Sequence, residues 1–198
     1  MNLGLLCGAV LVLLTGPAAA QVTKFDVFGV RVGDGPEAVA RALTEKGFSK
    51  DEELRGPTFD EQVALRRNKI DFGSAKGAVK EITYRRDSDK ISIMFTAWPD
   101  GEKVTRVFYR PNITQADCPA FKSAAQQKYG VGIEYAGEWI DRPVEKTNGL
   151  SERKLDETVS IEAKCGAGSR YLSMDLFGAQ KMQNQMLDKA DGEVKHDF

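Results

Sequence analysis

Cysteine is the residue type in this sequence with the clearest choice between two chemistries. Of the three cysteines, Cys118 stands between Asp117 and Pro119, at the start of a segment with the pattern of a helix that ends at Gly130. The helix dipole lowers the pKa of a thiol in the first turn, so Cys118 could act as a nucleophile. Alternatively, the thiol forms a structural disulfide. The choice depends on the cell compartment and on the neighbouring residues.

The first twenty residues bear on the compartment. An uncharged apolar run from Leu3 to Leu14 is followed by a Gly16-Pro17 break and by Ala18-Ala19-Ala20, which fits the small-residue pattern of a signal peptidase site. We therefore expect a signal peptide over residues 1–20, a mature chain over 21–198, and a location in the periplasm or outside the cell. Cys7 lies in the segment expected to be removed. No later segment is apolar enough to predict a transmembrane helix.

The two remaining cysteines are expected to pair, because exported proteins fold in oxidising surroundings. Cys118 shares the apolar side of its helix with Phe121 and Ala125, and Cys165 ends the alternating apolar run that begins at Val159. Both thiols should therefore face the core. A nucleophilic thiol would need a base and a second redox cysteine, and the sequence has neither a Cys-x-x-Cys motif nor a suitably placed histidine. We predict the disulfide Cys118–Cys165.

No other pattern indicates a catalytic or metal site. The only histidine, His196, lies among the last residues, where a frayed segment could not hold an imidazole rigidly. Residues 71–77 contain glycines and a lysine but lack the Gly-Lys-Ser/Thr order of a phosphate-binding loop. Acidic residues are plentiful, but no spacing singles out a pair. We expect no cofactor and no metal, and two alternatives stay open: a carboxylate-dependent hydrolase and a carrier of a small apolar ligand.

An interaction surface is the remaining functional possibility. Trp98 precedes Pro99-Asp100-Gly101, a hairpin signal, and Arg106, Phe108 and Arg110 alternate along the following run. We therefore name Trp98, Arg106 and Arg110 as candidate contacts for a protein or an envelope component. The alternative is that Phe108 packs under a helix and the arginines lie at the rim of a sheet. A formal net charge of −1, with acidic and basic residues interspersed, argues against nucleic acid as the partner.

The secondary structure that must position these residues follows from periodicity and capping signals. Asp34 can cap a helix that has Pro36 in its first turn and ends at Gly47, with Phe48 folding back onto it. We expect helices over 34–47, 117–130 and 179–190, a loop over 49–60, and strands near 61–68, 78–86, 91–98, 103–110, 133–139, 159–165 and 172–176. The last helix is expected to bury Met182, Met186 and Leu187. This order predicts an α+β fold in which helices pack on one face of an antiparallel sheet.

The two earlier helices share a spacing. Asp34, Pro36 and Gly47 match Asp117, Pro119 and Gly130 in an Asp-x-Pro pattern with a glycine eleven positions after the proline. A capped helix of ordinary length would produce part of this match by itself. Two organisations stay open: a single α+β domain over 21–198, or repeats at about 25–110 and 111–178 followed by a helix over 179–190.

The first helix also resembles a known one. The run from Gly33-Asp34-Gly35 through Val39 and Leu43 to Gly47-Phe48 resembles the helix that opens small bacterial envelope domains related to the β-lactamase inhibitor protein and to the SmpA/OmlA outer-membrane assembly lipoproteins. Gly33-Asp34-Gly35 replaces the usual Gly-Met-Thr/Ser start, and the lipid-bearing cysteine is absent. The resemblance implies a module of helices and sheet that binds protein without catalysis. We therefore expect a non-catalytic binding module of the cell envelope.

Overall fold

The fold is that of a computed structural model, which describes residues 25–129, 138–141, 159–166 and 168–192. The predicted signal peptide, residues 133–137 of a predicted strand, and His196 lie outside the described residues. The described helices are α1 (Pro36–Glu45), α2 (Phe59–Arg66), α3 (Cys118–Tyr129) and α4 (Ala179–Gly192). The strands are β1 (Ser49–Gly56), β2 (Ala78–Arg86), β3 (Asp89–Trp98), β4 (Gly101–Arg110), β5 (Glu138–Asp141), β6 (Val159–Gly166) and β7 (Ser169–Leu176).

All these strands form one sheet, and every neighbouring pair is antiparallel. The order across the seven-stranded sheet is β1-β2-β3-β4-β7-β6-β5. Pairing of β4 with β7, from Arg106 opposite Asp175 to Tyr109 opposite Leu172, joins the first four strands to the last three. The predicted α+β class with an antiparallel sheet is therefore confirmed.

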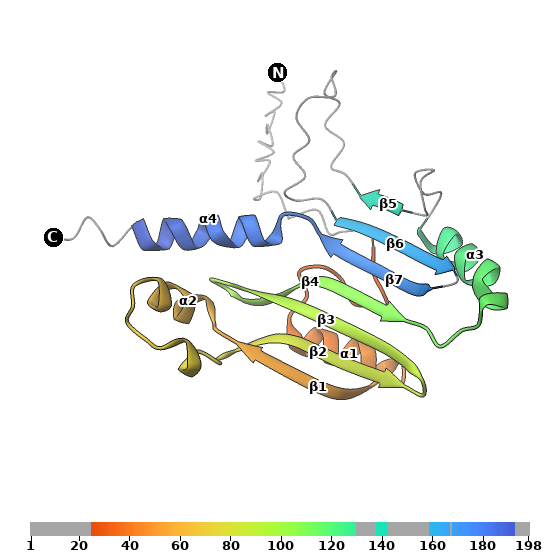
Figure 1. The fold of residues 1–198 in the computed structure, drawn as a ribbon, viewed down its shortest axis with the longest axis horizontal. Helices are drawn as coiled ribbons and strands as arrows, with labels where there is room; N and C mark the ends of the chain where they lie inside the picture. The colour runs from red at the N-terminus through yellow and green to blue at the C-terminus, as the bar shows by residue number, and fades with distance from the viewer. Residues whose placement is uncertain (1–24, 130–137, 142–158, 167, 193–198) are drawn as a thin grey trace, which may run out of the picture.

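The core lies on one face of this sheet. Val39 and Leu43 of α1 are fully buried among inward residues of the central strands, such as Ile91 and Ile93. In Figure 1, α1 lies behind the sheet.

The segment that precedes α1 reaches the sheet as well, because the Gly33 amide donates to the Val104 carbonyl at 2.9 Å. Helix α3 adds Ala125 and part of Phe121 and Tyr129 to the same core.

The end of α1 follows the predicted pattern, whereas its start does not. Gly47 has a φ of +79°, and the Phe48 amide donates to the Leu43 carbonyl at 3.0 Å, which ends the helix as expected. The predicted cap at Asp34 is wrong. Gly35 is the N-cap residue and makes no side-chain cap bond. The Asp34 carboxylate instead accepts a hydrogen bond from the Arg31 amide at 2.7 Å, so it closes the turn before the helix.

The segment between α1 and β2 differs from the prediction. Residues 49–56, predicted as loop, form the edge strand β1, and residues 61–68, predicted as a strand, fall largely in α2. Helix α2 begins with a capping box: the Glu61 amide donates to the Thr58 hydroxyl at 3.1 Å, and the Thr58 amide donates to the Glu61 carboxylate at 2.8 Å. These two bonds satisfy donors that the first turn of a helix would otherwise leave unpaired.

Helix α4 packs against α2 and the end of β3. Arg66 forms an ion pair with Asp188, and Arg67 forms one with Asp191 at 2.9 Å. The amide of Gln183, a buried residue, donates to the Ala97 carbonyl at 2.9 Å. The helix runs two residues beyond the predicted end. It buries Leu187 as predicted and Met182 in part, but Met186 is 39 % exposed, so the expected burial of Met186 is wrong.

The predicted disulfide is present. Cys118 at the start of α3 is bonded to Cys165 in β6, with 5.4 Å between their Cα atoms. Both residues are buried, as the apolar patterns around them indicated. The bond links α3 to the sheet across 47 residues of sequence.

The proposed duplication remains a prediction. Helix α1 precedes the meander β1–β4, and helix α3 precedes β5–β7, so each half has a helix followed by antiparallel strands. Helix α2 has no counterpart among the described residues of the second half. The shared sheet means that the two halves contribute to one continuous core.

An aromatic cluster joins the segment before α1 to the sheet. Phe28 packs edge-to-face on Tyr109, with ring centroids 4.8 Å apart, and tilts against Phe48 at 5.1 Å. The Arg86 guanidinium lies 4.4 Å from the centroid of the Phe48 ring. Phe28 has a φ of +55°, which an aromatic residue adopts only when its surroundings hold it there. The cluster thus fixes the turn formed by Val27–Val30.

Asp89 connects this cluster to the loop after β4. Its carboxylate accepts hydrogen bonds from the Tyr109 hydroxyl at 2.7 Å, the Asn112 amide at 2.8 Å and Arg86 at 3.0 Å. Burial alone would raise the pKa of Asp89, but these donors together hold the pKa below its ordinary value. Asp89 therefore stabilises the fold mainly in its charged form.

Asp89→Asn is expected to lower the free energy of unfolding at pH 7 by about 1–2 kcal/mol, because the charged acceptor is lost. The folded-state pKa is depressed, so this contribution is present above the unfolded pKa and is lost as pH falls through the folded pKa. The difference between the two proteins should therefore shrink below about pH 4 in urea unfolding curves. Asp87→Asn, at an exposed turn, is the matched control. A difference that stays constant with pH would contradict this role for the charge.

Candidate binding surface

The side of the sheet away from α1 is the candidate functional surface. Because side chains alternate along a strand, the buried Ile91, Ile93 and Tyr109 face the helices, and their neighbours Ser92, Phe108 and others face the opposite side. We call this opposite side the open face. It is the side of the sheet turned away from α1 in Figure 1, and no described helix covers its centre over β4, β7 and β6.

A stacked aromatic pair stands on the open face. The rings of Phe108 in β4 and Tyr171 in β7 have centroids 5.0 Å apart and an interplanar angle of 30°. The Arg110 guanidinium lies 5.0 Å from the centroid of the Phe108 ring, within the range of a cation–π contact. The Tyr171 hydroxyl donates to the Glu162 carboxylate at 3.0 Å. Both rings remain partly exposed, so the pair offers apolar area to solvent.

The neighbours of Phe108 across the sheet are short. Its register partners are Ser92 in β3 and Ser173 in β7, and beyond Ser92 lies Thr83 in β2. The hydroxyls of Thr83 and Ser92 are 3.3 Å apart and form a hydrogen bond between the two strands. Thr83 and Ser173 are buried, whereas Phe108 is partly exposed, so the Phe108 ring provides accessible area at this position.

An ion pair borders the aromatic pair on the side toward α4. Arg106 in β4 pairs with Asp175, its register partner in β7. The Arg106 side chain is about half exposed, whereas Asp175 is mostly covered. Because Asp175 is mostly covered, the ion pair holds Arg106 beside the aromatic pair, with about half of the arginine side chain open to solvent.

The structure separates the three residues named as candidate contacts. Arg106 and Arg110 lie on the open face, on either side of Phe108. Trp98 is 8 % exposed, so its expected exposure at the hairpin tip is wrong. The Ala97 carbonyl, one residue before Trp98, accepts a hydrogen bond from Gln183 of α4. Trp98 therefore lies where α4 packs against the end of β3. Trp98 therefore belongs to the core.

Two residues of the surface were not named from the sequence. Tyr171 and Asp175 enter it only because β7 pairs with β4. Phe108, for which the sequence leaves open either this surface or packing under a helix, lies on the open face. The alternation of Tyr171, Ser173 and Asp175 with buried Leu172 and Met174 was visible in the sequence. It could have placed these side chains on one face of a strand, but not beside Phe108.

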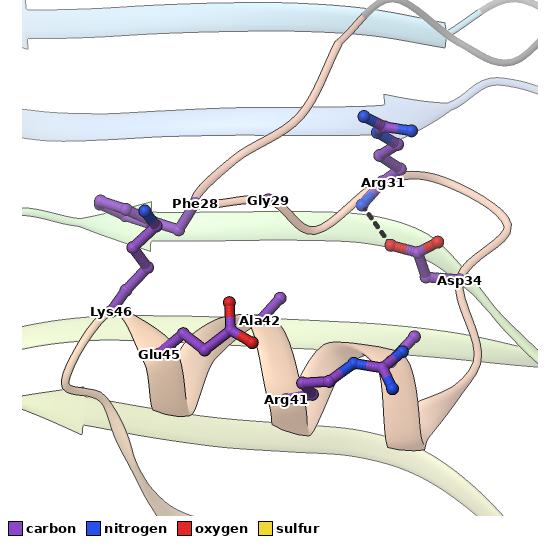
Figure 2. Close-up of a pocket in the computed structure, with 9 residues that line it drawn as sticks. Phe28, Gly29, Arg31, Asp34, Arg41, Ala42, Glu45 and Lys46 are labelled. Carbon is purple, nitrogen blue, oxygen red and sulfur yellow. Dashed lines mark hydrogen bonds between the residues drawn. The ribbon is translucent and has the colours of Figure 1, made fainter.

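A hollow of about 410 Å³ lies elsewhere, between α1 and the turn before it (Figure 2). Its lining is Phe28, Gly29, Arg31, Asp34, Ala38, Arg41, Ala42, Glu45 and Lys46. Figure 2 shows Arg31 turned away from α1, while Glu45 and Arg41 extend from the helix. Five of its nine lining residues are charged, and both signs are present, so the hollow does not suit carriage of an apolar ligand.

Five of the described carboxyl groups have pKa values below their ordinary ones, which is the opposite of what a general acid requires. A general acid at neutral pH needs a raised pKa. The pKa values of Glu53, Glu61 and Asp117 are lowered because hydrogen-bond donors surround these groups. Those of Asp26 and Asp89 are lowered because donors and cations outweigh the opposing effect of burial. These five groups are structural acceptors. In the described part of the chain, no group of three or more histidines, cysteines or acidic residues could hold a metal ion.

Two further findings bear on the class of protein. Within the described ranges, no helix has the length and apolar character needed to cross a membrane. Comparisons with protein-family models, with curated proteins and with solved structures found no match to this chain. The resemblance to small bacterial envelope domains therefore remains a prediction from one helix.

Proposed function

We propose that this protein is an exported, non-catalytic binding module whose open face contacts another protein of the cell envelope. The single observation that supports this function best is the stacked Phe108–Tyr171 pair with Arg110 over it, on a side of the sheet that no described helix covers. A few residues dominate the binding energy of protein interfaces, and tyrosine and arginine are enriched among them.

Export is part of the proposal. The buried disulfide between α3 and β6 is of the kind that persists in oxidising compartments, and the apolar run at the start of the sequence has the pattern of a signal peptide. We therefore place the binding module in the periplasm or outside the cell. Radiolabelled precursor processing in spheroplasts would test this part: a mature chain that starts at Gln21 in the periplasmic fraction is expected, and a full-length cytoplasmic chain would contradict it.

The binding surface is tested by site-specific photocrosslinking in native envelope. A photoreactive residue at Ser92, beside Phe108, is expected to give a stoichiometric adduct with one partner. The same residue at Ala38, on the other side of the sheet, is the control and should give none. An adduct at Ala38 alone would show that the proposed face is the wrong one.

Phe108→Ala is expected to reduce capture of that partner roughly 30-fold, the effect of losing a contact worth about 2 kcal/mol. Its thermal midpoint should change little, because the ring is partly exposed in the free protein. Phe177→Ala removes a 40 % exposed ring just beyond β7 and should leave capture unchanged. Equal capture by wild-type protein and both variants would contradict the proposed surface.

A further inference from the structure

Basic side chains line up across the open face, beside the aromatic pair. Lys90 in β3 has Arg85 as its register partner on one side and Arg110 on the other. Continuing the β4–β7 register places Tyr171 opposite Arg110, and Lys164 in β6 is the register partner of Tyr171. The side chains of Lys90, Arg110 and Lys164 thus share one row, which we call the cationic row.

The three cations of the row form no ion pair with the described residues, although the Glu162 carboxylate lies beside the row, bonded to Tyr171. Arg85, at the end of the same row, forms an ion pair with Asp51. By contrast, no carboxylate in the described ranges forms an ion pair with Lys90, Arg110 or Lys164. Arg110 and Lys164 are exposed and Lys90 is half-buried. Positive charge therefore faces solvent along the row, in a protein whose formal net charge is −1.

We propose that the cationic row binds an acidic segment of the partner protein in extended conformation. This inference rests on the proposed function and specifies the chemistry of the partner. Neighbouring strands are about 4.8 Å apart, so Lys90 and Lys164, three strands apart, are separated by roughly 14 Å. Same-face side chains four residues apart in an extended segment are separated by about 13 Å. Acidic residues at positions i and i+4 thus match Lys90 and Lys164.

The middle of such a segment meets the aromatic pair. The side chain at position i+2 lies between the two acidic ones and reaches Arg110 and the exposed edges of Phe108 and Tyr171. An acidic or aromatic residue suits this position, because a carboxylate pairs with the guanidinium and a ring packs on the exposed edges. The expected recognition pattern therefore alternates acidic residues around one acidic or aromatic residue.

A protein segment fits this surface better than a nucleic acid strand. Glu162 lies on the same face and accepts a hydrogen bond from Tyr171 within the row, so it would repel a phosphate of a continuous chain that passed beside it. In a peptide, the carboxylates are separated by uncharged residues. The carboxylates can therefore lie over the cations of the row while uncharged residues of the peptide lie beside Glu162. The charge balance of the face therefore favours an acidic peptide.

The test uses a labelled twelve-residue peptide in which Glu alternates with Thr around one central Tyr. Fluorescence anisotropy with the purified protein should show binding that weakens about tenfold between low and high salt. The triple variant Lys90→Gln, Arg110→Gln, Lys164→Gln should bind at least about tenfold more weakly. The matched triple variant Lys46→Gln, Lys69→Gln, Lys122→Gln removes the same charge elsewhere and should bind like wild type.

Three outcomes of the peptide assay would overturn the inference: no binding of the peptide, equal loss in both triple variants, or equally tight binding of oligothymidylate. Equal loss would mean that net charge matters and the row does not. Oligothymidylate binding would identify the surface as a general polyanion site.

Partner capture separates this inference from the proposed function. If Phe108→Ala abolishes partner capture while the cationic row variant retains it, the proposed function stands and this inference fails. If neither variant affects capture, the proposed function fails too.

Discussion

Replacing both Cys118 and Cys165 with alanine is expected to lower the free energy of unfolding by about 4 kcal/mol. The disulfide closes a loop with a sequence separation of 47 residues, and its loss lets the unfolded chain explore many more conformations. Both cysteines are buried, and alanine puts no polar group in their place. Urea unfolding curves of the oxidised wild type and the double variant give this difference directly.

The structure also predicts where the double variant should loosen first. Helix α3 contributes few fully buried side chains besides Cys118, with Ala125 the only other one. Amide hydrogen exchange should therefore accelerate in α3 more than in β3 or β4, which lie at the centre of the sheet. Reduced wild-type protein is the control and should behave like the double variant. Two free thiols in unreduced, denatured wild type would contradict the disulfide itself.

Sequence patterns predict those helix ends and turns that are fixed by hydrogen bonds or backbone angles of neighbouring residues. The end of α1 depends on Gly47 and Phe48, which bond to carbonyls of the preceding turn, and the β3–β4 hairpin depends on Gly101, with a φ of +108°. The capping box of α2 was equally local, with Thr58 and Glu61 in the sequence. The prediction of a loop over 49–60 and a strand over 61–68 conflicts with this signal, which the structure shows to start a helix.

Strand β1 could not be identified from its own residues. Its side chains are almost all exposed, because it is an edge strand, and it therefore lacks the alternation of apolar and polar residues that marks a half-buried strand. Its conformation comes from pairing with β2, from Ser49 opposite Arg85 to Gly56 opposite Ala78. The pairing is a tertiary contact that periodicity does not report.

In the candidate surface too, local patterns predict some residues, and others depend on contacts between distant segments. Arg106 and Arg110 were placed on one strand face by alternation alone, and the structure has them on the open face. Trp98 was misplaced because its burial depends on α4: the bond from Gln183 to Ala97 spans 86 residues. The partner of Phe108, Tyr171, likewise depends on β4 pairing with a strand more than sixty positions away in the sequence. Such contacts follow from the fold as a whole.

Phe48→Ala is expected to lower the free energy of unfolding by about 4 kcal/mol, as large aromatic truncations in a packed core do. Phe48 is 3 % exposed, and its ring contacts Phe28 and Arg86 on the helix side of the sheet. Its loss leaves a cavity and also removes the support that holds Phe28 at a positive φ. The turn before α1 and the end of α1 should then both loosen, which hydrogen exchange can detect.

Two variants separate the parts of this effect. Phe48→Leu keeps most of the apolar volume but removes the contact with the Arg86 guanidinium, so a loss of about 1–2 kcal/mol is expected. Phe177→Ala deletes an exposed ring and should change the free energy of unfolding by less than about 0.5 kcal/mol. If Phe48→Leu were as damaging as Phe48→Ala, ring-specific contacts and not buried volume would hold this end of α1 to the sheet.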